Sequence, residues 1–91
     1  MNNLLFLPQG WEDYLYCQEQ DKRMDKRMAK RINSLIADAM RSPFSGIGKP
    51  EPLKNNLTGW WSRRIDDTHR LVYKPEKDQL VIAACRTHYG S

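Results

Sequence analysis

The stretch that decides the fold is WWSRRIDDTHRLVYKPEKDQLVIAAC, residues 60–85. Three runs in it are typical of β-strands: residues 60–65, 70–74 and 79–85. The first two alternate between polar and apolar side chains, and the third is almost continuously apolar, which suits a central strand. The polar segments Asp66-Asp67 and Pro75–Asp78 favour turns between them.

Upstream of this stretch, the chain begins with a short apolar run followed by residues at helical spacing. Leu4–Leu7 is closed by Pro8 and Gly10, which predicts one more strand. From Trp11 a first helix is expected. Its apolar face is predicted to carry Trp11, Tyr14, Leu15 and Gln18, with Glu12, Asp13, Cys17 and Glu19 elsewhere.

A second helix is predicted by apolar residues at the spacing i, i+4, i+8, i+11, i+12 and i+15: Met24, Met28, Ile32, Leu35, Ile36 and Ala39. It should end before Pro43. Within it, residues 21–24 (Asp-Lys-Arg-Met) are repeated as residues 25–28. Four residues are about 1.1 helical turns, so the repeat should lengthen this helix by ~6 Å, with either Asp21 or Asp25 as its N-cap. A solvated charged face is the favoured interpretation of the repeat, and an RNA-facing ridge is the alternative.

Together these elements predict a single α+β domain over residues 1–91. The segment 42–56 contains three Pro and two Gly and is expected to be a loop. The order β-α-α-β-β-β then gives a helical hairpin on one face of a mainly antiparallel four-stranded sheet. The other face should stay open and concave, where a ligand could lie.

Composition narrows the classes of function. The net charge of +4 favours an anionic partner, nucleic acid before membrane, although a merely basic protein fits equally well. Cys17 and Cys85 form no CxxC pair, and His69 and His88 are far apart, so we expect no metal site and no cofactor. We see no signal peptide and no span of ~20 apolar residues, which predicts a cytoplasmic protein with no membrane partner.

The C-terminal half contains side chains of the kinds that RNA cleavage without a metal would require. Such cleavage needs a base for the 2′-hydroxyl, an acid for the leaving 5′-oxygen, and cations for the charge that develops on phosphorus oxygens. The available set is Glu51, Lys54, Arg64, Arg70, His88 and Tyr89. Because side chains alternate along a strand, Arg63 and Arg64 should point to opposite faces, so at least one lies on the open face.

Taken singly, each of these residues has a plainer interpretation. Glu51 could be an ordinary loop carboxylate, His88 a surface histidine near a chain end, and Tyr89 a packing residue. Trp60 and Trp61 also alternate, so one should be in the core while the other could stack on a base or enter a partner interface.

Read together, the residues closely resemble the YoeB branch of the RelE/ParE toxin superfamily. The segments that carry the resemblance run through nearly the whole chain: Trp11–Tyr16, residues 25–28 with Arg31-Ile32-Asn33, Ser42-Pro43-Phe44, Gly48–Lys54, Gly59–Ile65, His69–Tyr73, Ala83–Arg86 and His88-Tyr89. The combination of GKPEPL, WSRRI, HRLVY and HY is highly specific. The extra Asp-Lys-Arg-Met unit and the terminal Gly90-Ser91, which we interpret as an addition, depart from the family pattern.

The resemblance implies a RelE-like fold and a ribosome-dependent endoribonuclease that cuts mRNA in the A site of the 70S ribosome. It implies Glu51 as general base, His88 as general acid, Arg70 as the group that stabilises the phosphorane-like charge, and Tyr89 as the residue that orients the scissile nucleotide. Positive field would come from Lys54 and Arg64, with Lys49 and Arg63 also expected to bind substrate. The resemblance further implies a YefM-like antitoxin, contact with operator DNA only through the antitoxin complex, and a homodimer.

Two other functions fit the same fold. A gyrase-poisoning toxin of the ParE type would act by binding, and it would not need Glu51, His88 and Tyr89 together. A non-catalytic nucleic-acid-binding module would depend on the arginines and lysines but not on Glu51 or His88.

Overall fold

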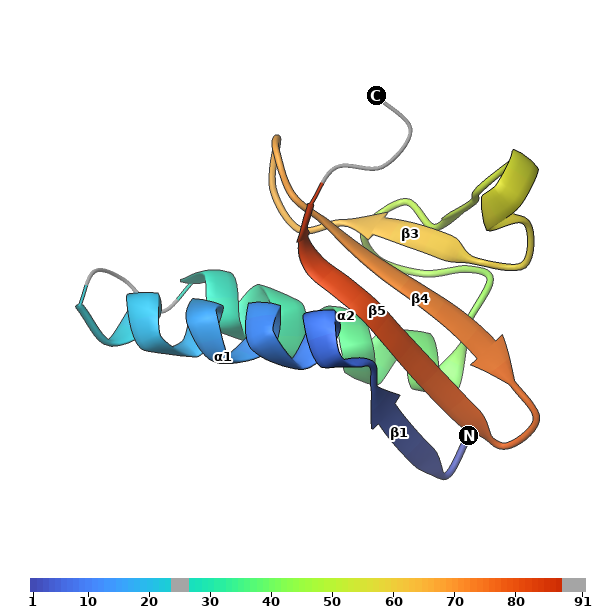
Figure 1. Ribbon diagram of the computed structural model, residues 1–91, viewed down its shortest axis with the longest axis horizontal. Helices are drawn as coiled ribbons and strands as arrows, with labels where there is room; N and C mark the ends of the chain where they lie inside the picture. The colour runs from blue at the N-terminus through green and yellow to red at the C-terminus, as the bar shows by residue number, and fades with distance from the viewer. Residues whose placement is uncertain (24–26, 88–91) are drawn as a thin grey trace.

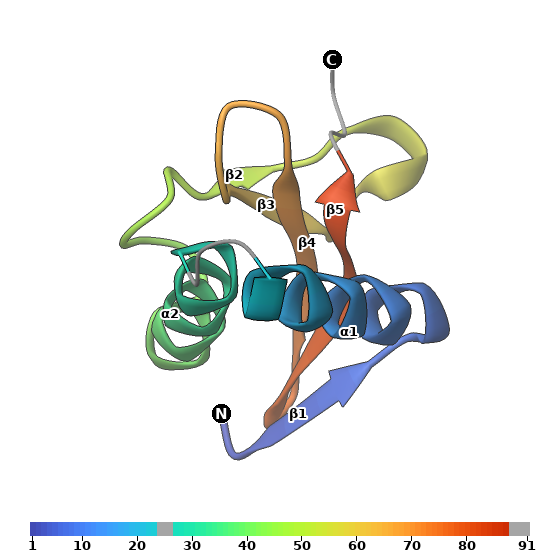
Figure 2. The same cartoon turned by 90° about the vertical axis from the view of Figure 1, so that its left-hand side faces the viewer.

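The structure, a computed structural model, describes residues 1–23 and 27–87. Its elements in chain order are β1 (Asn3–Phe6), α1 (Pro8–Arg23), α2 (Arg27–Arg41), β2 (Glu51–Pro52), the short 3-10 helix η1 (Asn55–Leu57), β3 (Trp61–Arg64), β4 (Arg70–Glu76) and β5 (Gln79–Thr87). Both helices lie on one face of the sheet, as Figures 1 and 2 show. The expected architecture of a helical hairpin on a mainly antiparallel sheet is confirmed. The strand count differs, because β2 forms inside the segment predicted to be loop.

The five strands follow the order β1-β5-β4-β3-β2, which places β5 between the first strand and the rest of the sheet. β1 pairs with β5 in parallel, and the other three pairings are antiparallel. Register shifts between Arg70 and Tyr73 interrupt the pairing of β4 with β5. A local irregularity of this kind increases the twist of a sheet. Figure 2 shows β5 passing behind α1, and in the sheet β5 has β1 on one side and β4 on the other.

The core lies between the helices and the sheet. Its buried members come from α1, from α2, from β4 and β5, and from the turn after β3: Cys17, Ile32, Leu35, Ile36, Ala39, Ile65, Leu71, Tyr73, Leu80, Ile82 and Cys85. The α2 residues among them confirm the apolar spacing predicted for the second helix. Within residues 1–23 and 27–87, neither helix is long and apolar enough to cross a membrane.

The first helix packs through a different face from the one predicted. Trp11 and Leu15 are each 47% exposed, whereas Asp13 and Cys17 are buried. The reason is a close approach at Gly10, where an added Cβ would lie 2.5 Å from the Ile82 carbonyl oxygen. This proximity lets the Asp13 carboxylate accept a hydrogen bond from the Cys85 backbone N–H at 3.1 Å. A backbone contact and a buried carboxylate thus set the orientation of α1, and apolar periodicity does not register either of them.

The prediction that both copies of the Asp-Lys-Arg-Met unit lie in the second helix is wrong. Residues 21–23 end α1, and Arg27 and Met28 begin α2. Asp21 therefore lies within α1 and is not the N-cap of α2. Met24, predicted on the apolar face of the second helix, and Asp25, a predicted N-cap, fall outside the described residues. Because helical spacing continues through the repeat, the sequence pattern alone does not show that the chain reverses there.

Candidate active site

Pairing of β2, β3 and β4 brings Glu51 and Arg70 into contact. In the sheet Glu51 pairs with Ser62 of β3, and Arg64 of β3 pairs with Arg70 of β4. One Arg70 nitrogen, Nη1, lies 2.9 Å from Glu51 Oε1 and also donates a hydrogen bond of 3.2 Å to Ser62 Oγ. Strand parity left open whether these side chains converge, and the structure brings Arg70 of β4 into contact with Ser62 of β3 and Glu51 of β2. The Ser62 contact itself was missed, although the same parity could have indicated it.

The two members of this pair differ in exposure. The Glu51 side chain is 54% exposed and the Arg70 side chain is 20% exposed, while Ser62 is fully buried beneath them. A partly exposed carboxylate can reach a substrate hydroxyl, and a guanidinium fixed by two acceptors keeps one orientation. The site therefore combines an accessible carboxylate with a positioned cation.

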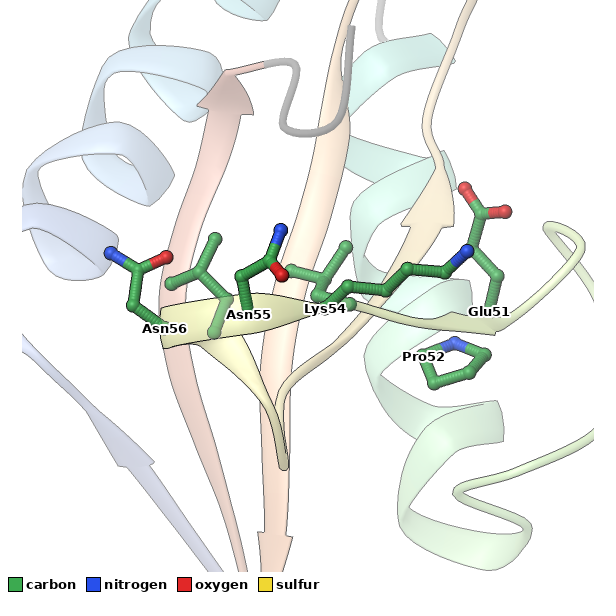
Figure 3. Close-up of a pocket in the computed structure, with 7 residues that line it drawn as sticks. Glu51, Pro52, Lys54, Asn55 and Asn56 are labelled. Carbon is green, nitrogen blue, oxygen red and sulfur yellow. The ribbon is translucent and has the colours of Figure 1, made fainter.

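Three further cations predicted to bind substrate are exposed near this pair. Arg64 ends β3, where its backbone N–H donates to the Gly48 carbonyl at 2.7 Å. Lys49 follows Gly48 and adopts a left-handed backbone with φ of 53°. Lys54 lies between β2 and η1, and Figure 3 shows its side chain running toward Glu51. All three are placed where they can add positive charge around an incoming phosphodiester.

Beside Glu51 the surface is hollowed. A cavity of about 460 Å³ is lined by seven consecutive residues, Glu51–Leu57. Figure 3 shows the Glu51 carboxylate and the Asn55 amide on the same side of this segment, while the Pro52 ring lies on the other side. The sequence reasoning did not predict this hollow, which is built by β2 and η1 next to the Glu51–Arg70 pair.

Arg63 corrects one expectation for the site. Its side chain is fully buried on the helix-facing side of the sheet, so it is not available to bind RNA. Its donors contact five protein acceptors at 2.6–3.1 Å: Asp38 Oδ2, Tyr73 Oη and the carbonyl oxygens of Ser42, Ser45 and Ile47. Parity predicted that one of the two neighbouring arginines would face away from the open surface. It did not predict that a guanidinium would hold the 42–47 loop in place.

Two side chains in contact with Arg63, Asp38 and Tyr73, have shifted pKa values. A hydrogen bond from Arg63 holds the pKa of the Asp38 carboxyl below its usual value. Burial raises the pKa of Tyr73, whose hydroxyl donates to the Pro43 carbonyl at 2.6 Å. The sequence gives little indication of Asp38, which is one acidic residue in the last turns of a helix. The network stabilises the loop that leads through Gly48 to Glu51.

The two neighbouring tryptophans have separate roles. Trp61 packs against the core and contacts the Phe44 ring with centroids 4.9 Å apart. Trp60 lies against β4 instead, with the Lys74 ammonium 5.7 Å from its ring centroid. The expectation that one of them is a core residue is therefore confirmed for Trp61.

The proposed acid and the terminal tyrosine, His88 and Tyr89, lie outside the described residues. The last described strand position, Thr87, is in register with Arg70. The chain therefore leaves β5 opposite the residue that contacts Glu51.

Known proteins match this chain over almost its whole length. The family described as YoeB-like toxin of bacterial type II toxin-antitoxin system matches residues 6–89. Toxin YoeB of Streptomyces coelicolor is 60% identical over 86 residues, which cover 94% of this chain and 98% of that protein. The YoeB dimer from Staphylococcus aureus is 47% identical, with a TM-score of 0.83 and coverage of 97% and 98%. The YoeB–YefM complex from the same organism matches at 46% identity and a TM-score of 0.81, covering 98% and 99%.

Proposed function

The chain belongs to the YoeB-like toxin family of bacterial type II toxin–antitoxin systems, and from this membership we propose that it is a metal-independent endoribonuclease that cuts mRNA in the ribosomal A site. The observation that supports this most directly is the 2.9 Å contact of Glu51 with Arg70 on an accessible part of the sheet. It joins a carboxylate that can act as a base to a cation that can stabilise a phosphate.

In the proposed reaction, Glu51 takes the proton from the 2′-hydroxyl, whose oxygen attacks the adjacent phosphorus. The new P–O2′ bond forms as the P–O5′ bond breaks, and His88 gives a proton to the departing 5′-oxygen. The products are a 2′,3′-cyclic phosphate and a free 5′-hydroxyl. Tyr89 would orient the scissile nucleotide.

Arg70 would stabilise the negative charge that develops on the phosphorus oxygens. Its guanidinium carries five N–H donors, and the contacts with Glu51 and Ser62 both use Nη1. The same side chain can therefore remain beside Glu51 while other N–H groups bind phosphate. Arg64, Lys54 and Lys49 would add positive field around the RNA backbone.

The test is primer extension on a ribosome-bound message with purified wild type and variants. We expect Glu51→Gln and His88→Ala each to slow cutting by roughly 10²–10⁴-fold, because each removes a proton-transfer group. Ribosome binding, measured by cosedimentation, should change little. Matched controls are Glu12→Gln, an exposed glutamate on α1, and His69→Ala, the other histidine.

The alternatives predict different outcomes. A binding module would keep its inhibitory effect in Glu51→Gln and His88→Ala and lose it only when arginines or lysines are replaced. A gyrase poison would block DNA supercoiling in vitro and leave mRNA intact. Equal cutting of naked mRNA and of ribosome-bound mRNA would contradict the ribosome-dependent mechanism.

Protein partners form part of the same proposal. We propose a YefM-like antitoxin, operator DNA contacted only through the antitoxin complex, and a homodimer. The S. aureus YoeB structures of a dimer and of a YefM complex support this for a chain of the same family. Large apolar side chains that are 41–47% exposed on β1 and α1 also support a protein partner: Leu4, Leu5, Trp11, Leu15 and Tyr16.

A further inference from the structure

We propose that the hollow beside Glu51 is a nucleobase-binding subsite, in which the side-chain amides of Asn55 and Asn56 read the edge of a base next to the cleaved bond. This inference rests on the proposed nuclease function and adds to it a source of sequence preference. It assigns a role to the segment Glu51–Leu57, in which only Glu51 and Lys54 had a predicted function.

The first support is the continuity of the hollow with the reacting groups. Glu51 lies at one end of the lining segment and Asn55–Leu57 at the other, with Lys54 between them. Figure 3 shows the Asn55 amide standing on the side to which the Glu51 carboxylate points, and the Asn56 amide at the opposite end from Glu51. The volume of about 460 Å³ is within the range of about 300–1,000 Å³ that is usual for small-molecule sites. A base attached to a phosphate at Glu51 and Arg70 would therefore have this hollow beside it.

The second support is the rigidity of the turn that presents the amides. The Asn55 carbonyl accepts two hydrogen bonds from Thr58, at 2.7 Å from Oγ1 and 3.1 Å from the backbone N–H. The Leu57 N–H donates to the Lys54 carbonyl, and the Leu53 N–H donates to the Trp60 carbonyl. Asn55 adopts a left-handed backbone with φ of 60°, a conformation that asparagine tolerates better than most residues. A fixed turn can present a side-chain amide in one orientation.

The third support is the chemistry of the amides themselves. Each carries one acceptor and two donors, and within residues 1–23 and 27–87 neither side chain has a hydrogen-bond partner. Paired donors and acceptors match the edge of a base, whereas a phosphate offers only acceptors. The neighbouring cation, Lys54, is the group suited to phosphate. The hollow thus separates a base-reading part from a backbone-binding part.

The experiment measures cutting of four ribosome-bound messages that differ only in the nucleotide on one side of the cleaved bond, and then of four that differ on the other side. The variants are Asn55→Gly, which keeps the left-handed backbone accessible, Asn56→Ala, and the matched control Asn2→Ala on the exposed N-terminal segment. We expect wild type to prefer one nucleotide at one position. In Asn55→Gly or Asn56→Ala the ratio of the fastest to the slowest message should fall by about 10-fold, the effect of losing one good base contact.

Three outcomes would overturn the subsite: equal wild-type rates on all four messages at both positions, an unchanged ratio in both variants, or a uniform loss of rate on every message. If wild type cuts no message at all, the nuclease proposal fails and the subsite is judged by binding. In that arm, 2′-O-methyl trinucleotides are added to ¹⁵N-labelled protein. Shifts of the Asn55 and Asn56 side-chain NH₂ resonances that depend on base identity support base reading, and their absence at millimolar concentration refutes it.

Discussion

Replacing Tyr73 by Phe tests the buried network around Arg63. The hydroxyl group of Tyr73 accepts a hydrogen bond from Arg63 Nε at 3.0 Å and donates one to the Pro43 carbonyl at 2.6 Å. Both Tyr73 and Arg63 are fully buried, so water cannot replace the lost group without rearrangement. The Phe side chain keeps the ring and its packing, and the change therefore isolates the hydroxyl.

The expected loss of stability follows from those two bonds. Leaving a charged, buried donor without its acceptor costs roughly 1–3 kcal/mol, and the bond to Pro43 contributes about 1 kcal/mol more. The free energy of unfolding should therefore fall by about 2–4 kcal/mol. For a domain of this size, that corresponds to a decrease of roughly 10–25 °C in the midpoint of thermal unfolding.

The measurement is urea and thermal unfolding followed by circular dichroism. Tyr14→Phe is a matched control, because its hydroxyl donates one exposed hydrogen bond of 2.9 Å to Asn33. That variant should lose less than about 1 kcal/mol. If Tyr73→Phe is as stable as Tyr14→Phe, the network does not hold the 42–47 loop in the way we infer.

For three further perturbations, the structure predicts the direction of the change in stability. Gly10→Ala should destabilise by about 1–3 kcal/mol in urea unfolding, because its Cβ would meet the Ile82 carbonyl oxygen at 2.5 Å; wild-type stability would contradict the close approach. Burial raises the pKa of the Cys85 thiol from 9.0 to about 12, so the unfolded thiol ionises first and stability should fall as pH rises above 9. The loss should reach about 1.4 kcal/mol at pH 10 and be absent in Cys85→Ala. The hydrogen bond with Arg63 lowers the pKa of Asp38. The stability that the ionised Asp38 carboxylate contributes is therefore fully present above pH 3.8 and is lost as the pH falls through the folded-state pKa. Asp38→Asn should remove that part of the acid dependence, and an unchanged acid profile would count against the ion pair.

Strand parity was the most informative signal in the sequence for the site. It placed Arg63 and Arg64 on opposite faces without any knowledge of the sheet order, and the buried Arg63 and the exposed Arg64 confirm it. The position of Glu51 could not be obtained in this way. Glu51 belongs to a strand of two residues within a segment rich in Pro and Gly, and such a strand is too short to show alternation.

Hydrophobicity was a poorer guide where polar groups are buried. Asp13 lies against β5 because the Cys85 amide needs an acceptor there, and Arg63 is buried because backbone carbonyls surround it. Both residues are charged, so periodicity assigns them to the surface. Trp11 and Leu15 show the opposite error, because periodicity predicts them on the packed face of the first helix and both are exposed. The burial of Asp13 and of Arg63 depends on contacts with residues far away in the sequence, and a local sequence pattern does not show such contacts.

The position of β5 next to β1 has a consequence for the order in which the sheet can assemble. Among the described strands, β1 pairs with β5, which follows the other four strands along the chain. A nascent chain that still lacks residues 79–87 has nothing to join its first strand to the hairpin formed by β3 and β4. Native contacts that span so much of the sequence form late. The order of the sheet thus makes the placement of β1 beside the other strands depend on residues 79–87.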